Sequence, residues 1–247
     1  VQKIFYKLNL MEKAKKIKII LGIIYFLILF IFLWSFFSFF LMNEISTYEF
    51  IKKNRNLLLD FKENNFLLTT IIFFISCILW VFLLGFGSPV ALLGGFVFGK
   101  WFGTLIVILS LTIGATCLYL FANYFLKEFV REKFEKKFGK MLNNFKKNEF
   151  LYFFIYRFVG GIPFFIANIL PTLFNIKIKN YFFGSLFGMV PGIFIIVSLG
   201  SGLEKIIDEN LEQPSFFDLI KSPEIFIPII SFLFLFLITF IIRKKLN

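Results

Sequence analysis

Two stretches decide the fold of this chain: GFGSPVALLGGFVFGKWFG at residues 85–103 and RFVGGIPFFIANILP at residues 157–171. Both are apolar enough to lie in a lipid bilayer, yet Gly and Pro interrupt them too often for an unbroken helix. Lipid offers no hydrogen-bond partner to the backbone groups that such a break frees, so irregular backbone persists at membrane depth only where protein or a water-filled cavity covers it. Paired interruptions in the two halves of a membrane chain indicate a transport site.

The composition is that of an integral membrane protein. Of the 247 residues, 59% are hydrophobic and 21% aromatic, with a mean hydropathy of +0.85, whereas a soluble domain is about half apolar. The chain has no His, which removes the commonest general base and metal ligand. Its two Cys are isolated, so we expect no metal site, and we expect no cofactor. The net charge of +12 comes from bases beside apolar segments, which favours anionic lipid over nucleic acid as the partner.

Five segments are predicted to span the membrane: residues 19–42, 66–84, 105–125, 181–199 and 225–242. The segment at 181–199 is predicted to be kinked near Pro191-Gly192. The interrupted stretches at 85–103 and 150–176 are predicted to form re-entrant hairpins. A capping-box pattern at residues 46–49 predicts a short surface helix to about residue 61. The expected fold class is therefore an all-α membrane protein, a helical bundle of about five transmembrane helices with two facing re-entrant, broken-helix hairpins.

Three regions follow from this pattern. Residues 1–65 form an N-terminal membrane anchor and polar loop, residues 66–203 form the core, and residues 204–247 form an acidic loop and a C-terminal transmembrane helix. Within the core, residues 127–149 combine apolar side chains every three or four positions with eight bases and four acids. This segment is interpreted as a basic amphipathic helix on an anionic lipid surface. The alternative is a solvated helix that packs on its own protein.

A faint internal repeat relates the two interrupted stretches. Pro89 and Pro163 each open one of them, and each is followed 25 or 28 residues later by a second small-residue point, Gly114-Ala115 or Pro191-Gly192. An inverted repeat explains this spacing. The orientation stays open, because the count of bases favours an outside N-terminus, whereas the six bases before the first span favour an inside one.

Arg157 is the strongest candidate for a functional side chain. Neither the segment between Leu151 and Leu203 nor that between Phe66 and Leu126 contains Asp or Glu. An arginine in the membrane costs at least ~3 kcal/mol and normally needs a partner. The remaining partners are helix-end carbonyls, an outer-loop acid such as Glu204, water, or an anionic ligand such as phosphate, which the planar guanidinium binds through two oxygens. The alternative is that Arg157 snorkels to the interface or caps a helix.

Other residues of the two stretches are assigned to binding or to hairpin formation. Gly160 and Gly161 could present backbone N–H groups to the same anion, and Pro163 lies beside them. Asn168 could contact a ligand or hold the hairpin by bonding freed backbone. Lys100 is expected at a water boundary. The residues expected to form the hairpins through turns and close helix contacts are Pro89, Gly94, Gly95, Gly99, Gly103, Gly114 and Pro171.

These motifs resemble the DedA/VTT superfamily, also called the SNARE-associated Golgi protein family, and are most similar to its bacterial branch shared with yeast and animal Golgi membrane proteins. The first hairpin of that family carries a Pro, then Gly-x-x-Phe-Gly, then Gly-Ala, which correspond here to Pro89, residues 95–99 and Gly114-Ala115. The second carries Arg-x-x-Pro-x-x-Pro with an Asn five residues on, matched by Arg157, Pro163 and Asn168. The resemblance covers roughly residues 66–203 and implies two facing re-entrant hairpins.

Three departures from the family pattern stand out. Gly160 replaces the first Pro of the second motif, and Asn123 stands where an arginine usually closes the helix after Gly-Ala. The acidic pair that the DedA branch carries in its first hairpin is missing. Because those acids are associated with proton coupling in that branch, the resemblance does not imply proton coupling through them here.

The resemblance implies phospholipid scrambling or transport of lipid-linked phosphates such as undecaprenyl phosphate. The main hypothesis is therefore a multi-pass transporter or scramblase of the bacterial inner or plasma membrane, not an enzyme, whose partners are phospholipid or polyprenyl phosphate. The alternatives are a secondary transporter of a small solute or ion, and a membrane scaffold without transport activity. The oligomeric state stays open.

Overall fold

The computed structural model describes residues 20–25, 27–32, 34–35, 47–125, 127–128, 132, 148–159, 162–209, 221–223, 225–231, 233–234 and 237. The chain divides into two units, Val1–Ser46 and Thr47–Asn247. In the first unit the described residues form an apolar helix, Ile20–Phe32, with most of its large side chains exposed. The prediction at 127–149 falls largely outside the described residues, and those at 19–42 and 225–242 fall outside them in part, while Gly160 and Gly161 are not described. The second unit contains helices α2 to α10.

The first half of this unit contains one sharp hairpin turn. Helix α2 (Thr47–Asn64) leads into α3 (Phe66–Phe82), and the turn after α3 is followed by α4 (Gly87–Phe98) and α5 (Lys100–Phe125). Leu84 adopts a φ of +63° in the turn. The Trp80 indole N–H donates to the Phe86 carbonyl at 2.8 Å and covers Gly85, where a Cβ would overlap the indole ring. The turn therefore requires Gly85 and receives a hydrogen-bond donor from α3.

The second half repeats this order with a more broken chain. Helix α7 (Glu149–Val159) is followed by α8 (Phe164–Ile169) and the 3₁₀ turn η1 (Leu170–Leu173), then by α9 (Ile178–Gly188) and α10 (Val190–Glu209). Pro163 is the N-cap of α8, and Pro89 is the third residue of α4. Both prolines lie where a missing N–H removes no intrahelical hydrogen bond.

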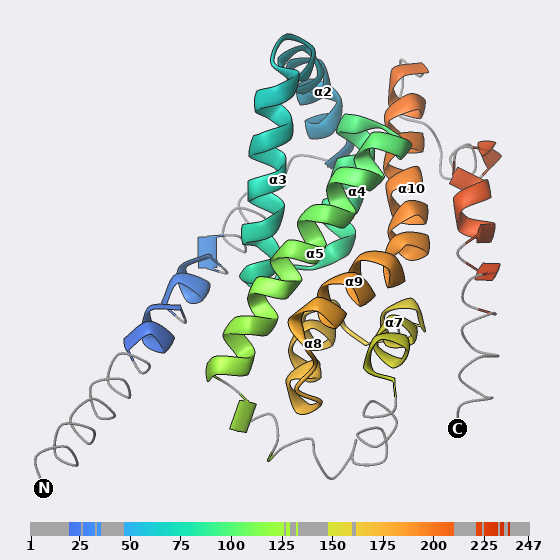
Figure 1. The fold of residues 1–247 in the computed structure, drawn as a ribbon. Helices are drawn as coiled ribbons and strands as arrows, with labels where there is room; N and C mark the ends of the chain where they lie inside the picture. Colours follow the sequence, from blue (N-terminus) through green and yellow to red (C-terminus); the bar gives the residue numbers. More distant parts are fainter. Residues whose placement is uncertain are drawn as a thin grey trace, which may run out of the picture. The chain divides into compact units, whose positions relative to one another are not determined.

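The two halves pack reciprocally around the broken segments. Helix α3 packs on α5 and α7 packs on α9, while the short α4 packs chiefly on α10 of the other half, and α8 and η1 pack on α5. In Figure 1, α4 turns back toward the end of the bundle where α2 lies, and α8 turns toward the opposite end. With 12 residues, α4 is about 18 Å long, too short to cross a bilayer core of ~30 Å. This arrangement matches the predicted inverted repeat.

The turns of the two hairpins meet. The rings of Phe86 and Phe165 form an edge-to-face pair with centroids 6.3 Å apart. A Cβ built on Gly87 would lie 3.5 Å from the Phe164 ring, which is ordinary van der Waals contact. The points at which α4 and α8 begin are therefore neighbours, although they are far apart in the sequence.

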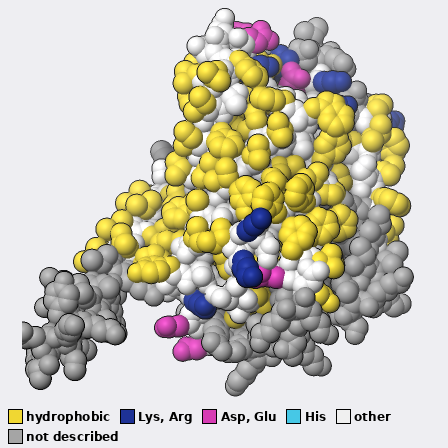
Figure 2. Space-filling model, viewed as in Figure 1, with side chains coloured by type: hydrophobic (Ala, Val, Ile, Leu, Met, Phe, Trp, Pro, Cys, Tyr) yellow, Lys and Arg dark blue, Asp and Glu magenta, His cyan; other side chains and the backbone are white. Residues whose placement is uncertain are grey.

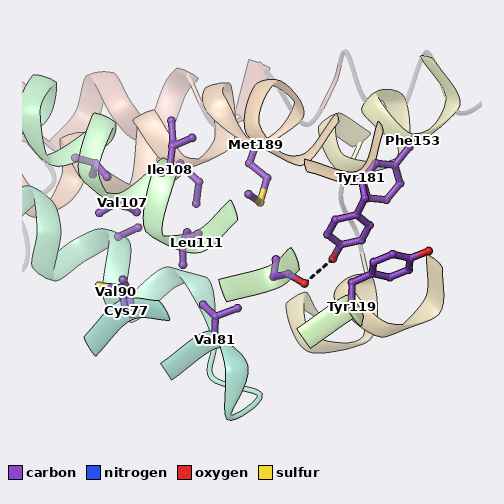
Figure 3. Close-up of a cluster of buried hydrophobic side chains, with 14 of the residues drawn as sticks. Cys77, Val81, Val90, Val107, Ile108, Leu111, Tyr119, Phe153, Tyr181 and Met189 are labelled. Atoms are coloured by element: carbon purple, nitrogen blue, oxygen red, sulfur yellow. Dashed lines mark hydrogen bonds between the residues drawn. The ribbon is translucent and has the colours of Figure 1, made fainter. Parts of the chain in front are cut away.

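The core and the surface are both apolar, as expected in a bilayer. Buried side chains from α3, α4, α5, α7, α9 and α10 form one cluster, of which Figure 3 shows the part from Cys77 and Val81 to Tyr119, Phe153 and Tyr181. Figure 2 shows hydrophobic side chains over most of the visible face, with charged side chains both near the upper end around α2 and in the middle and lower part of the face. The chain is an all-α membrane protein, and no strand occurs among its described residues.

Among the described residues, two helices are long and apolar enough to cross a membrane, Lys100–Phe125 and Val190–Ile207. A third span arises if Asn54–Asn64 and Phe66–Phe82, which meet at a bend of 113°, are counted together. By itself α3, predicted as a span at residues 66–84, has 17 residues.

The kink predicted near Pro191-Gly192 is confirmed as a break at Met189, which divides the predicted span at 181–199 between α9 and α10. Three predicted boundaries are wrong. Helix α10 continues to Glu209, so the expected acidic loop begins inside it. The first interrupted stretch ends at Gly99, which has a φ of +74°, and Gly103 lies within α5. The surface helix runs to Asn64 instead of residue 61.

The closest helix contact is made by glycines facing a backbone. A Cβ on Gly95 of α4 would overlap the Val197 carbonyl oxygen of α10, and a Cβ on Gly200 would overlap the Leu92 carbonyl oxygen. On α5, a Cβ on Gly114 would approach the Ile78 carbonyl oxygen of α3 to 2.9 Å. The prediction that Gly95 and Gly114 allow close helix contact is therefore confirmed.

We expect Gly95→Ala to destabilise the protein by about 1–3 kcal/mol, because a carbonyl cannot rotate away from the new methyl group as a side chain could. The melting temperature of the purified protein in detergent measures this loss. Gly192→Ala is the matched control, since nothing lies within 4 Å of a Cβ at this helical position. Equal melting temperatures for the two variants would contradict the backbone contact.

Candidate functional site at Arg157

Arg157 lies in the last turn of α7 and points into the bundle. It is eight residues beyond Glu149, the first residue of α7, which places it about 12 Å along the helix. Its side chain is only 8% exposed. A Cβ on Gly188 of α9 would lie 2.6 Å from the Arg157 Cβ, so the small residue on α9 makes the space for the arginine. Arg157 therefore does not snorkel to the rim of the bundle.

The guanidinium group is held by two hydroxyls and two aromatic faces. Its Nε donates to Ser185 Oγ at 3.0 Å, and its Nη2 donates to the Tyr181 hydroxyl at 2.7 Å. The Phe153 and Tyr181 rings each have their centroid 5.2 Å from Cζ. Phe153 is one turn before Arg157 on α7, and Tyr181 and Ser185 are one turn apart on α9. These contacts attract the positive charge without neutralising it.

The Tyr181 hydroxyl joins four helical segments. It accepts from Arg157 of α7 and lies 3.2 Å from two acceptors, the Ala115 carbonyl of α5 and the Asn168 carbonyl of α8. Figure 3 marks the bond to α5 with a dashed line and shows Tyr119 beside Tyr181. The two tyrosine rings stack with centroids 4.3 Å apart. Arg157 and Asn168, both predicted site residues, are thus linked through one hydroxyl.

No carboxylate pairs with Arg157 within the described residues. Glu204, the predicted outer-loop partner, instead forms an ion pair with Arg55 of α2. The Glu149 carboxylate accepts from the Lys177 backbone N–H at 2.8 Å and from the Asn180 side chain. The two acids that α7 and α10 bring nearest to the core are thus engaged at other places, and the guanidinium charge keeps only neutral partners.

Three buried polar side chains next to this site have unpartnered atoms in the described part of the chain. They are both amide atoms of Asn168, the hydroxyl of Thr172 and the hydroxyl of Thr112, and all three residues are fully buried. Asn168 and Thr172 are one turn apart on α8 and η1, which pack on α5, the helix that carries Thr112. Each unsatisfied group costs about 1–3 kcal/mol, so such groups in a native protein require an explanation. Among the described residues, no cluster of His, Cys, Asp or Glu could hold a metal ion.

The other predicted site residues are divided between two places. Pro163 caps α8, and Pro171 is buried in η1 next to Thr172. The hairpin residues of α4 and α5 instead pack elsewhere: Gly94 faces Val107, Gly95 faces Val197 and Gly103 faces the Gly94 carbonyl. A cavity of about 350 Å³ also lies away from Arg157, beside Lys100 and α10.

Sequence reasoning missed Tyr181, Ser185 and Phe153 as partners of the arginine, and Tyr119 as the ring that stacks on Tyr181. Tyr181 and Ser185 carry a usable signal, because two hydroxyl residues four positions apart in an apolar helix share one face. Phe153 carries none, because it is one of 42 phenylalanines in the chain.

Comparison with known proteins supports the resemblance to the DedA/VTT superfamily. The family model of the VTT domain matches residues 84–202, which include both hairpin turns, Arg157 and Tyr181. The Transmembrane protein 41 homolog of Caenorhabditis elegans is 26% identical to the chain over 165 residues, which cover 64% of this chain and 66% of that relative, just under two thirds of its length. No solved structure matches the chain.

The match to the VTT domain covers the two hairpin turns and the buried arginine. The similarity to the Transmembrane protein 41 homolog is consistent with this match. Both findings support a membrane location for the protein. Residues 84–202 match the VTT domain, and this match supports the resemblance to the DedA/VTT superfamily that the hairpin motifs predicted.

Proposed function

We propose that this protein is a non-enzymatic, multi-pass transporter of the bacterial inner or plasma membrane that translocates or scrambles phospholipid or a lipid-linked phosphate such as undecaprenyl phosphate. Arg157 binds the phosphate, and the acyl chains stay in the surrounding lipid. One observation carries the proposal: the arginine is buried where the second hairpin meets α9, and its described partners are hydroxyls and aromatic rings without a carboxylate.

A phosphate group fits the unbalanced charge of this site. The guanidinium fork donates two parallel N–H bonds to an oxyanion, and such charged bonds are roughly twice as strong as bonds to neutral acceptors. A phosphate oxygen can therefore replace the Ser185 and Tyr181 hydroxyls as acceptor. The hydroxyls released in this way can themselves donate to the phosphate. Arg157, Tyr181 and Ser185 therefore bond to one another in the empty site and to the phosphate in the occupied site.

Translocation also requires that the site be reached from both leaflets. The reciprocal hairpins support this, since α4 and α8 enter from opposite ends and their turns meet at Phe86 and Phe165. No nucleotide-binding motif occurs in the sequence, so movement follows the lipid gradient. The basic segment at residues 127–149 lies on the anionic lipid surface in this proposal.

A second candidate function is secondary transport of a small polar solute or ion. It is favoured by the unpartnered atoms of Asn168, Thr172 and Thr112, which are buried on α8, η1 and α5, three elements that pack together. Amide and hydroxyl oxygens are suitable ligands for a small cation or a polar solute. Lipid exchange and solute uptake by the same vesicles separate the two functions.

Arg157→Gln should lower the rate of lipid exchange at least about tenfold, because a charged hydrogen bond to the phosphate is lost. The purified protein is reconstituted in liposomes that contain fluorescent phospholipid or polyprenyl phosphate, and leaflet exchange is followed by quenching from outside. Arg157→Lys, which keeps the charge but not the fork, should give an intermediate rate.

Arg55→Gln is the matched control, since Arg55 pairs with Glu204 away from the site, and it should retain the exchange rate of the unmodified protein. Size-exclusion chromatography and circular dichroism establish that each variant is folded. Exchange no faster than in protein-free liposomes for every lipid tested would overturn the proposal and favour a solute carrier or a scaffold.

Tyr181→Phe should destabilise the protein by about 1–3 kcal/mol, because it leaves Arg157 and a buried carbonyl without their common partner. Tyr124→Phe removes a hydroxyl from an exposed side chain of α5 and serves as the control. Thermal unfolding in detergent compares the two. If both variants have the melting temperature of the unmodified protein, the Tyr181 hydroxyl does not stabilise the packing of the four segments.

A further inference from the structure

A second cationic site lies at the end of the bundle where α5 begins. A cavity of about 350 Å³ is lined by the first residue of α5, by α10 between Phe194 and Lys205, and by Pro223, Ile227, Pro228 and Ser231. Its walls include two basic side chains, Lys100 and Lys205, and the hydroxyl of Ser201. The volume is in the range of small-ligand sites, about 300–1,000 Å³. None of the residues at the Arg157 site lines this cavity.

The charge of the cavity is positive. Among the described lining residues, Lys100 and Lys205 are the charged ones, and no carboxylate is present. Glu204, the neighbour of Lys205 in sequence, is engaged by Arg55. The hydroxyls of Ser198 and Ser231 donate to carbonyls of their own helices, which leaves the two ammonium groups and Ser201 as donors to a ligand. An anion is therefore the ligand that this wall selects.

The other wall of the cavity is apolar and runs toward the middle of the bundle. Phe194 and Ile227 line it, and Phe194 lies 11 residues before Lys205 on α10, about 16 Å along the helix. Trp101, which follows Lys100, is 72% exposed and its ring lies 5.3 Å from that of Phe194. Exposed tryptophan beside lysine is typical of the boundary between membrane and water. The cavity thus offers cations at its polar end and hydrocarbon along its length.

We propose that this cavity binds an anionic phospholipid, with the phosphate between Lys100 and Lys205 and an acyl chain along Phe194 and Ile227. The apolar wall distinguishes this ligand from a soluble phosphate, which would gain nothing from it. The site is independent of lipid translocation at Arg157, because the two share no residue.

The test is a titration of the purified full chain in detergent micelles with short-chain phosphatidylglycerol, read by microscale thermophoresis. An ammonium group near a lipid phosphate contributes about fivefold in affinity, so Lys100→Gln combined with Lys205→Gln should raise Kd about 30-fold. Lys100→Arg combined with Lys205→Arg should bind like the unmodified protein. Lys177→Gln combined with Lys179→Gln, which removes two exposed charges elsewhere, is the matched control and should leave Kd unchanged.

Two further ligands identify what is bound. Phosphatidylcholine, whose choline cancels the phosphate charge, and inorganic phosphate should both bind at least about tenfold more weakly than phosphatidylglycerol. Inorganic phosphate that binds as tightly as phosphatidylglycerol would overturn the assignment to a lipid. If the Lys177 and Lys179 substitutions weaken binding as much as the Lys100 and Lys205 substitutions, the effect comes from the net charge and not from the cavity. The titration with phosphatidylglycerol is repeated with each variant in a background that also carries Arg157→Gln. If the loss caused by the Lys100 and Lys205 substitutions disappears in that background, the cavity is not a separate site.

Discussion

The rest of the structure depends on one constraint: every backbone carbonyl that a helix break frees in lipid must find a donor inside the protein. Aromatic side chains supply these donors. The Trp80 indole bonds the Phe86 carbonyl in the first turn, and the Tyr156 hydroxyl bonds the Ala167 carbonyl in α8. Tyr119 does the same for the Ile176 carbonyl after η1, at 2.7 Å. A tyrosine or tryptophan suits this task, because its ring packs like a hydrocarbon and only its tip is polar.

Tyr181 bonds a charged side chain as well as backbone carbonyls. Its hydroxyl accepts from Arg157 and can donate to the Asn168 carbonyl at the broken segment or to the Ala115 carbonyl of α5, and its ring offers a face to the same cation. The hydroxyl of Tyr181 thus both positions Arg157 and bonds a carbonyl of the broken helix. Together with Ser185 and Phe153, it offsets the free energy of burying the guanidinium charge. Because these partners are neutral, the site keeps a net positive charge in an apolar core, which a ligand with negative charge would balance.

Much of the fold could be predicted from sequence, because Gly, Pro and hydrophobic length act locally. The two broken stretches, the helices between them and the close contacts at Gly95 and Gly114 were all indicated by residue type. The Pro191-Gly192 pair indicated the break between α9 and α10, whereas the end of α10 at Glu209 was not indicated, because a hydropathy pattern does not show how far a helix continues into a charged segment. Arg157 stood out through the lack of acids around it, whereas Tyr181 became visible only when α7 and α9 were packed together.

The close packing of α4 on α10 at Gly95 and Gly200 has a consequence for the order in which the protein is made. The two residues are 105 positions apart in the sequence, and each is covered by the backbone of the other helix. At a synthesis rate of roughly 5–20 residues per second, α4 leaves the ribosome on the order of 5–20 s before α10 exists. During that time the first hairpin has no partner for its glycine face, so the nascent first half must be sheltered, by the insertion machinery or by lipid, until the second half closes over it.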